Sequence, residues 1–346
     1  MAAVKILSSP SKEYYFSNDV MDINNSSDDD SDSIFSIQTS SSASSFTRTN
    51  SHLANYRYEN NRRYQSYREG NWLLPNDEQE QDRMQIVDTM LSLLLDGELH
   101  LSPLSHPRRI LDVGTGTGVW ASDMAYKFPN TRVIGTDLSP IQVATPDNCT
   151  FEIEDADDNW LYPPNYFSMV HTRNLLGGIT NWKRFFDETY RSLHPNGWLE
   201  LHESPYKIYS NNPAYTDIPL MRTVTLFSDI SARLGRVCGE EVFGFKALME
   251  AAGFVDVTET RYRLPIGTWP DSTNEKEIGR YNLLNCLDGI EGFALAIVGQ
   301  GENIDPQEMM DEARKDILNK RARLYTTFII LRGRKPAACE VLPAQR

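Results

Sequence analysis

Three glycines in one short loop are the residues whose spacing first points to chemistry. Gly114, Gly116 and Gly118 follow an apolar run that contains Asp112 and ends in a valine. Glycine allows a backbone to turn tightly and to approach a ligand without a Cβ atom in the way. A dinucleotide-binding fingerprint, GxGxxG, would place its third glycine at the position that Val119 occupies. An acid just before the loop also suits a cationic ligand better than a diphosphate.

Two further acids stand where the next predicted strands end. Asp137 lies about twenty residues beyond the loop, where a carboxylate accepts both hydroxyl groups of a ribose. Asp155 closes the third strand, where an acceptor meets the exocyclic amine of adenine. A cationic group near Asp112, a ribose and an adenine together describe S-adenosylmethionine. The predicted cofactor-binding residues in these loops are Asp112, Gly114, Thr115, Gly116, Gly118, Asp137, Leu138, Asp155 and Ala156.

Each of these acids also has a purely structural interpretation. Asp112 is able to cap the first helix or to pin the loop, and Asp137 is able to begin the turn "DLSP". Asp155 stands in the run "EDADD", which offers four carboxylates for one role. The sequence alone leaves these alternatives open.

The elements that must position these residues alternate between strands and helices. Strands separated by helices and buried on both faces are typical of a parallel sheet. The sequence therefore predicts an α/β fold with a doubly wound, mostly parallel, seven-stranded sheet of the Rossmann-like type and helical cap insertions. The predicted strands are 108–113, 131–137, 150–155, 166–173, 198–203, 255–264 and 323–335, and the predicted helices within the fold are 117–128, 182–193 and 243–253. Pro195, Asn196 and Gly197 are expected to form a turn before the fifth strand.

Composition excludes several classes of function. A net charge of −14 over 346 residues disfavours a nucleic-acid backbone as the main partner. The four cysteines form no CxxC pair and the six histidines show no metal-ligand spacing. No apolar run approaches the roughly 20 residues of a membrane-spanning helix. We therefore expect a cytoplasmic protein without a metal site, a membrane association or direct nucleic-acid binding.

The chain resembles the class I S-adenosylmethionine-dependent methyltransferases, and among them the fungal LaeA-like and secondary-metabolite methyltransferases. The resemblance rests on "YREGNWLLPNDEQEQDR", "ILDVGTGTGVWASDMAYKFPNTRVIGTDLSPIQ", "FEIEDADDNW", "HTRNLLGGITNW" and "YRSLHPNGWLELHE". It implies that Asp112 and the glycine loop hold the methionine end of the cofactor, Asp137 the ribose and Asp155 the adenine. The sequence departs from many relatives at Asn196, where they carry a second glycine.

Four parts of the chain follow from this resemblance and from composition. Residues 1–52 are a serine- and aspartate-rich tail that is predicted to be disordered. Residues 53–106 form a helical or lid segment, with a helix capped by Asp77. Residues 107–335 form the methyltransferase domain, with cap insertions at about 205–240 and 270–322, and 336–346 form a second tail. The tyrosine-rich stretch 56–72 is either core packing under this helix or a lid over the cofactor.

The predicted catalytic residues follow the fourth and fifth strands. His171 is a candidate general base for a phenol or acid, because its ordinary pKa lies near neutral pH, although it also suits a loop-anchoring role. Glu203 is expected to face the same point, and His202 suits packing or orientation. Arg173 is a candidate for an anionic acceptor or for the cofactor carboxylate, and Arg68 competes for the second task.

Two functions are compatible with these residues. The first is methyl transfer to a small-molecule acceptor in fungal secondary-metabolite biosynthesis. The second is a LaeA-like nuclear regulator of secondary-metabolite gene expression that acts through protein partners. An intact cofactor motif argues against a third interpretation, a degenerate protein without catalysis.

Overall fold

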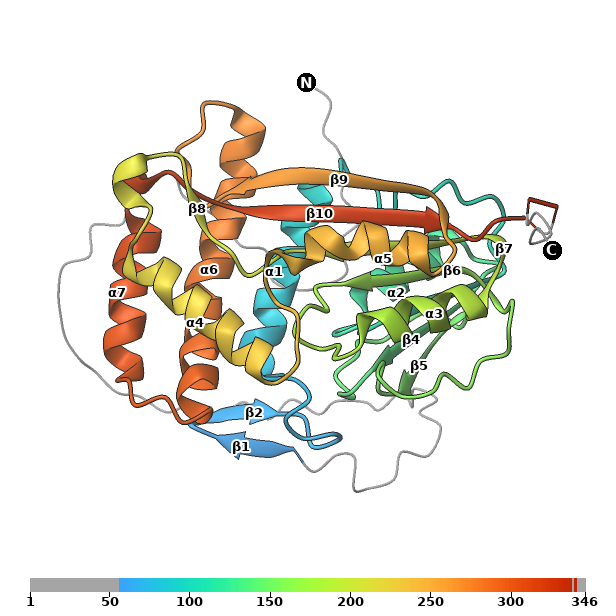
Figure 1. Cartoon of the computed structure of the whole chain (residues 1–346), viewed down its shortest axis with the longest axis horizontal. Helices are drawn as coiled ribbons and strands as arrows, with labels where there is room; N and C mark the ends of the chain where they lie inside the picture. The colour runs from blue at the N-terminus through green and yellow to red at the C-terminus, as the bar shows by residue number, and fades with distance from the viewer. Residues whose placement is uncertain (1–55, 338, 341–346) are drawn as a thin grey trace, which may run out of the picture. The chain divides into compact units, whose positions relative to one another are not determined.

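A twisted sheet runs through the molecule and carries the site at one edge. The computed structural model describes residues 56–337, 339 and 340, so the tail predicted over 1–52 lies outside the described residues (Figure 1). The strand order is β5-β4-β3-β6-β7-β10-β8, and β9 pairs with β10. The strands are β3 (Arg109–Val113), β4 (Arg132–Asp137), β5 (Cys149–Ile153), β6 (Phe167–Arg173), β7 (Leu193–Glu203), β8 (Tyr209–Ser210), β9 (Val255–Pro265) and β10 (Leu324–Arg334).

Strand directions confirm the predicted fold class. Neighbours from β5 to β7 are parallel, whereas β10 runs antiparallel to β7, β8 and β9. The order reverses between β3 and β6, and in such sheets ligands bind beyond the carboxyl ends of the strands at that point. The seven predicted strands are present. The eighth, β8, is two residues long and gave no sequence pattern.

The segment Pro195–Gly197 is a bulge within β7 and not a turn that precedes it. Phe167 pairs with Leu193 and Met169 pairs with Trp198, so the residues between the two partners in β7 bulge outward. Asn196 takes a φ of 67°, and its amide donates to the Lys335 carbonyl at 2.8 Å. The chain beyond β10 therefore pairs with the bulge, which lets the strand continue through a sequence that reads as a turn.

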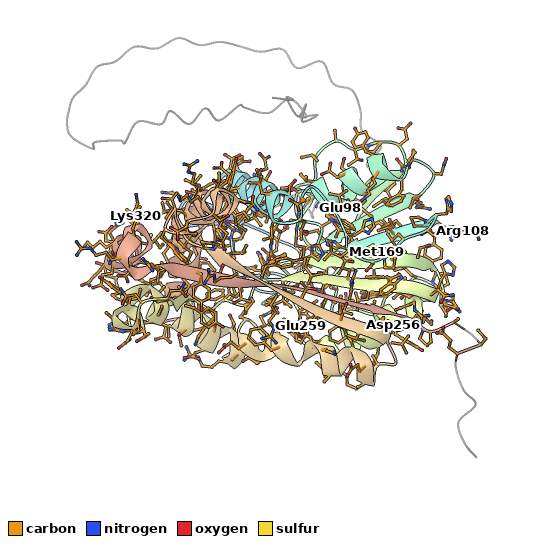
Figure 2. The ribbon with its side chains drawn as sticks, turned by 90° about the horizontal axis from the view of Figure 1, so that it is seen from above. Glu98, Arg108, Met169, Asp256, Glu259 and Lys320 are labelled. Atoms are coloured by element: carbon orange, nitrogen blue, oxygen red, sulfur yellow. The ribbon has the colours of Figure 1, made fainter. Side chains whose placement is uncertain are left out.

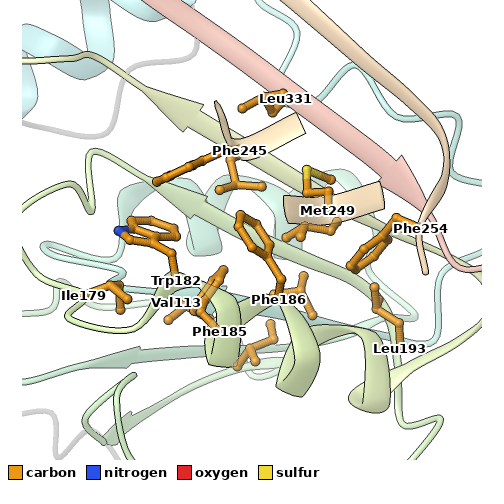
Figure 3. Close-up of a cluster of buried hydrophobic side chains, with 14 of the residues drawn as sticks. Val113, Ile179, Trp182, Phe185, Phe186, Leu193, Phe245, Met249, Phe254 and Leu331 are labelled. Atoms are coloured by element: carbon orange, nitrogen blue, oxygen red, sulfur yellow. The ribbon is translucent and has the colours of Figure 1, made fainter. Parts of the chain in front are cut away.

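Helices cover both faces of the sheet. α2 (Val119–Lys127) packs on one face through Trp120 and Met124. α3 (Trp182–Ser192) and α5 (Phe245–Ala251) cover the other face. In Figure 3 the aromatic side chains of α3 point toward Phe245, Met249 and Phe254. This apolar layer holds the carboxyl ends of the parallel strands in a fixed arrangement.

The remaining helices gather at the other end of the sheet and form a cap. α4 (Pro219–Arg233), α6 (Thr273–Gly299) and α7 (Pro306–Leu318) lie in the segments predicted to be helical insertions, and α6 packs along α1 (Glu78–Leu94) (Figure 1). Figure 2 shows Lys320 at the cap end and Arg108 at the opposite end, with Met169 between them. Short 3-10 helices stand at Pro213–Tyr215, Glu240–Gly244 and Lys320–Ala322.

α6 is longer and more apolar than the sequence led us to expect. It has 27 residues and its most apolar stretch reaches a mean hydropathy of 1.2, which is enough to cross a membrane by length and composition alone. In the fold it packs against α1, α4, α7 and β9. Its buried Asn282 donates to the carbonyl groups of Leu264 and Pro265. These contacts are those of an interior helix of the cap.

Residues 56–77, which we call the strap, lead into α1. The strap begins with a hairpin of β1 (Arg57–Glu59) and β2 (Arg62–Tyr64), where the sequence predicted a helical or lid segment. Asp77 ends the strap and caps α1 as predicted, because its carboxylate accepts from the Glu80 amide at 3.1 Å. The carboxylate of Glu80 binds Arg83.

Candidate functional site

One cavity of about 270 Å³ lies where the strand order reverses. Its floor is the loops that follow β3, β4, β5 and β6, and its other walls are the strap, α1 and α6. The predicted cofactor residues that line it are Asp112, Gly114, Thr115, Gly116, Asp137, Leu138, Asp155 and Ala156. Residues of α6 also line the cavity: Asn282, Asn285, Cys286, Gly289 and Phe293.

The glycine loop has backbone angles that favour glycine. Gly114 has a φ of 69° and Gly116 a φ of 56°, and a Cβ atom added to Gly114 would lie 2.6 Å from a methyl carbon of Leu175. Gly118 has a φ of 80° and begins α2, and its added Cβ would meet the Phe151 ring at 2.4 Å. Gly118 is not among the lining residues of the described chain. It therefore shapes the turn into α2, a correction to its predicted contact with the cofactor.

Asp112 is buried at the end of β3 and has two side-chain partners. Its Oδ2 accepts from the Thr115 hydroxyl at 2.6 Å, and its Oδ1 lies 2.7 Å from Nδ1 of His171. Burial raises the pKa of Asp112 to about 7, although the hydrogen bond from Thr115 opposes this. Asp112 therefore both fixes the glycine loop and lines the cavity, so the two interpretations of this residue do not exclude each other. A cation in the cavity would stabilise its ionised form.

Asp137 connects the glycine loop with the turn after β4. Its Oδ2 accepts from the Gly116 amide at 2.8 Å and its Oδ1 from the Ser139 amide at 2.9 Å. Burial raises the pKa of Asp137 to about 6 against these two hydrogen bonds and one from the Leu138 amide. A carboxylate has about four lone pairs, so Asp137 is still able to accept from a ligand hydroxyl group while it holds the loop.

Asp155 lies two residues beyond the end of β5. The strand ends at Ile153, whereas the sequence predicted that it ends at residue 155. Its Oδ2 accepts from the Asn71 side chain at 2.8 Å and its Oδ1 from the Asp157 amide at 3.0 Å. Asn71 in turn accepts from Arg236. A strap residue therefore fixes the orientation of the acid that is predicted to recognise adenine.

Arg68 does not reach the methionine end of the cavity. Its guanidinium donates to Asp158 at 2.6 Å and lies 3.7 Å from Asp155, and the side chain is 46% exposed. Arg173 lines the cavity instead and is paired with Asp88 of α1. Arg68 therefore lies nearer to the predicted adenine site than to the methionine end, and Arg173 is the better placed of the two cations for the cofactor carboxylate.

His171 is enclosed in a way that does not suit a general base. The side chain is fully buried and its ring stacks on Trp120 at 3.6 Å. Burial lowers the pKa of His171 well below its usual value, and the nearby His202 and Arg173 lower it further. The ring lines the cavity but lies two residues before the end of β6. This geometry favours the anchoring role, in which a neutral ring positions Asp112.

Glu203 is not at the cavity surface. It is fully buried, and its two oxygens accept from the amides of Leu175 and Leu176 at 3.0 and 3.3 Å. Burial raises the pKa of Glu203 to about 8. Glu203 ends β7 close to the cavity, as expected from the order of the strands, but its side chain turns toward the loop after β6. The catalytic assignment is corrected to a role in holding that loop.

A second buried network lies behind His171. His202 binds Glu200 at 2.7 Å, and the ring edges of His202 and His171 meet with centroids 4.9 Å apart. Burial raises the pKa of Glu200, but hydrogen bonds from His202, Ser102 and the Leu101 amide outweigh it and lower the pKa to about 2. His202 therefore has the orienting role that the sequence suggested, and Glu200 was missed.

Several polar residues that sequence reasoning missed bring the strap onto the cofactor loops. Asn76 donates to the Ser139 hydroxyl at 3.0 Å, and Gln142 donates to the carbonyl groups of Gly116 and Ser139. Tyr56 approaches the Pro140 carbonyl at 3.5 Å, and Trp72 lines the cavity. The strap therefore crosses the cofactor loops as a lid does. Asn76 stood in an apparent turn motif, which hid this role.

The residues present fit S-adenosylmethionine. Two carboxylates with raised pKa values, buried Asp112 and partly buried Asp137, suit a ligand that brings positive charge and hydroxyl groups. The bare loop at Gly114 and Gly116 leaves room for close backbone approach. Within residues 56–337 and 339–340 we find no group of three or more histidine, cysteine and acidic side chains that could hold a metal ion.

Comparison with known proteins agrees with this geometry. Residues 88–259 match the model of a methyltransferase domain family. The chain is 31% identical to the methyltransferase pytC of Aspergillus terreus over 85% of its own length and 92% of that protein. It is 32% identical to the secondary metabolism regulator LAE1 of Cochliobolus heterostrophus over 80% and 94%. Phosphoethanolamine N-methyltransferase 2 of Haemonchus contortus, solved with S-adenosylmethionine, is a distant structural neighbour at 17% identity and a TM-score of 0.46, covering 72% and 52% of the two chains.

Proposed function

Since the chain belongs to the family of S-adenosylmethionine-dependent methyltransferases that includes pytC and the LaeA regulators, we propose that it methylates a small molecule in secondary-metabolite biosynthesis. The observation that carries this proposal is the second half of the cavity. Beyond the cofactor loops the cavity continues between α1, α6 and the first half of β10, where Thr326 and Phe328 line it. Lining residues there are deeply buried, with Asn282 at 1% and Phe328 at 1% exposure. A pocket of this depth suits a small acceptor better than a protein side chain on a surface.

The chemistry needs little from the protein beyond positioning. When bound, the cofactor supplies an electrophilic methyl group, which an acceptor lone pair takes as the carbon–sulfur bond breaks and its electrons stay on sulfur. Asp112 and Asp137 hold the donor end, and the strap and α1 exclude water. Nδ1 of His171 is bound to Asp112, its Nε2 has no partner among the described residues, and burial lowers its pKa well below the usual value. Glu203 is bound by the amides of the loop after β6. We therefore assign neither residue as a base. A proton on the accepting atom would leave by the acceptor's own ionisation before the transfer, or would pass to solvent when the product leaves the cavity.

A nuclear regulator is the second candidate, and the similarity to LAE1 and laeA favours it. It would use the same cofactor half but would act through protein partners on gene expression. The two candidates predict different consequences of the same point change. Localisation follows the choice: we propose a cytoplasmic enzyme, with a nuclear protein as the alternative.

The test is a deletion strain that is complemented with the wild-type gene or with Asp112→Asn. The biosynthetic proposal predicts that one compound, or one related set, is lost and that its precursor accumulates one methyl group lighter. Asp112→Asn should behave as the deletion does, while Glu98→Gln, at a surface ion pair with Lys127, should behave as the wild type. Silencing of many unrelated pathways would support the regulator and contradict the biosynthetic enzyme.

A further inference from the structure

The wall of the cavity carries two polar groups without a hydrogen-bond partner among the described residues. Tyr206 lines the cavity, and its phenol hydroxyl has no hydrogen-bond partner within the described residues. The side-chain carbonyl of Gln65, which is 3% exposed, also has no partner among them. The Gln65 amide nitrogen donates to the Trp72 carbonyl at 3.0 Å, which fixes its oxygen as the free acceptor. Buried polar groups normally find a partner, so such atoms point to a ligand.

Tyr206 is held firmly by its backbone and its ring. Its amide donates to the Cys238 carbonyl at 2.7 Å, and its carbonyl accepts from Ser228 at 3.3 Å. The ring packs edge-on against Phe227 and Phe293, with centroids 5.4 and 5.2 Å apart. Burial raises the pKa of Tyr206, so its hydroxyl stays protonated and is available as a donor. A fixed donor among aromatic rings is a specific contact for a ligand oxygen.

The charged groups of this half are already neutralised. The Arg83 guanidinium donates from Nε and Nη2 to the two oxygens of Glu80, at 2.9 and 2.5 Å, and from Nη1 to Asn285. Glu80 is 4% exposed. Two other cations line the cavity: Arg173 is paired with Asp88, and Lys207, 42% exposed, lies 3.9 Å from Glu240. A second anion brought into the buried part of the cavity would therefore meet no unpaired cation among the described residues and would lose its water. An uncharged ligand avoids that cost.

We propose that this half of the cavity binds an uncharged aromatic hydroxy compound, with Tyr206 donating to its oxygen and Gln65 accepting a polar hydrogen. The inference rests on the proposed function and names its acceptor class. The aromatic rings of Tyr206 and Phe293 suit a flat apolar body, and the two unsatisfied atoms suit a group that both accepts and donates. Tyr206 is thereby a specificity-determining residue for the acceptor.

The experiment uses the full chain saturated with S-adenosylhomocysteine and three probes with one ring system. They are β-naphthol, naphthalene and a β-naphthol sulfonate, and their binding is followed by probe fluorescence and calorimetry. Tyr206→Phe removes only the hydroxyl and should raise the dissociation constant of β-naphthol by about threefold to tenfold. The dissociation constant of naphthalene should not change. Tyr209→Phe is the matched control, because its hydroxyl binds Glu240 and lies outside the cavity.

The sulfonate probe tests the preference for an uncharged ligand. It should bind the wild type at least about tenfold more weakly than β-naphthol does. Glu80→Gln leaves the Arg83 cation without its carboxylate and should shift the ratio of the two dissociation constants toward the sulfonate by a similar factor. Thermal unfolding of each variant checks that it folds.

These outcomes separate the inference from the function beneath it. S-adenosylhomocysteine binding without a preference for β-naphthol over naphthalene, or equal loss in the two tyrosine variants, would overturn the acceptor class alone. An absence of S-adenosylhomocysteine binding by the wild type would overturn the proposed function. Tight sulfonate binding by the wild type would show an anion site and would also overturn the inference.

Discussion

The two halves of the cavity hold their carboxylates in opposite electrostatic states. In the cofactor half, Asp112 is buried and Asp137 is partly buried, and neither has a lysine or arginine bound to it among the described residues. The loss of solvation raises their pKa values to about 7 and about 6. In the acceptor half, which with its surrounding helices we call the cap half, Arg83 binds Glu80. Beside the cavity, where the strap meets α1 and α6, Arg62 binds Asp77 at 2.6 Å. Burial raises the pKa of Asp77, but the Arg62 hydrogen bond and the backbone amides outweigh it and lower the pKa.

The carboxylates of the cap half find their partners when the chain folds, whereas those of the cofactor half are left for a ligand to neutralise. A buried carboxylate with a guanidinium partner stabilises its surroundings only as a pair. A buried carboxylate without one is held by burial in a state that a cation would relieve. The cap half is therefore expected to respond to mutation through stability, and the cofactor half through binding.

The largest expected effect is on the cap side. Arg62→Ala leaves Asp77 and Glu291, both bound by this guanidinium, without their cation. Because the Arg62 side chain is only 6% exposed, the free energy of unfolding should fall by about 3 kcal/mol. Urea unfolding measures the change.

The control for this variant is Arg280→Ala, which removes an exposed ion pair with Glu277 on α6. Its free energy of unfolding should change by less than about 0.5 kcal/mol. Equal effects of the two variants would remove the distinction between the buried pair and a surface pair.

The next effect is on the cofactor side. Asp112→Asn keeps the shape of the side chain but removes its charge, so S-adenosylmethionine should bind about 10- to 100-fold more weakly. Stability should change little or rise, since an unpaired buried charge is removed. Calorimetry with the sulfonium cofactor and with its neutral product S-adenosylhomocysteine separates charge from shape. Equal losses for the two ligands would contradict a charge-sensing role.

The same carboxylates predict the sign of a pH effect. The pKa of Asp112 is about 7 in the folded protein and near 3.9 in the unfolded chain. The folded state therefore holds the proton more tightly, and the stability that this contributes is lost as the pH rises from about 4 through about 7. Cofactor affinity should rise over the same range as the carboxylate ionises. Asp112→Asn should flatten both dependences.

The cofactor half could be predicted from sequence because it is local. The glycine loop and Asp137 each follow a strand, and the parallel topology brings strand ends together without further information. Errors appeared where side-chain direction decides the role. Glu203 lies at the predicted position in the chain, but its carboxylate turns toward the loop after β6. The sequence predicts where a strand ends. Successive side chains of a strand point to opposite faces of the sheet, so an uncertainty of one residue changes the face that a side chain is expected to occupy.

The cap half was beyond sequence reasoning because its contacts join distant segments. Arg62 and Glu291 are separated by 229 positions, and Arg83 and Asn285 by 202. No local pattern marks such partners in a single sequence. The strap hairpin was missed for a related reason, since its strands have three residues each and carry no alternation of apolar residues.

The smallest expected effect concerns His171, which binds a carboxylate of the cofactor half and was first predicted to act on the acceptor. As a positioning residue it holds Asp112 through Nδ1 and stacks on Trp120. His171→Phe keeps the stacked ring and loses the hydrogen bond, and it should weaken S-adenosylmethionine binding by about threefold to tenfold. His171→Gln keeps a donor and should recover part of that loss. A general base would behave differently, with unchanged cofactor affinity and methyl transfer slower by about 10²- to 10⁴-fold. Cofactor affinity that is unchanged in both variants would contradict the positioning role and return His171 to the acceptor side of the comparison.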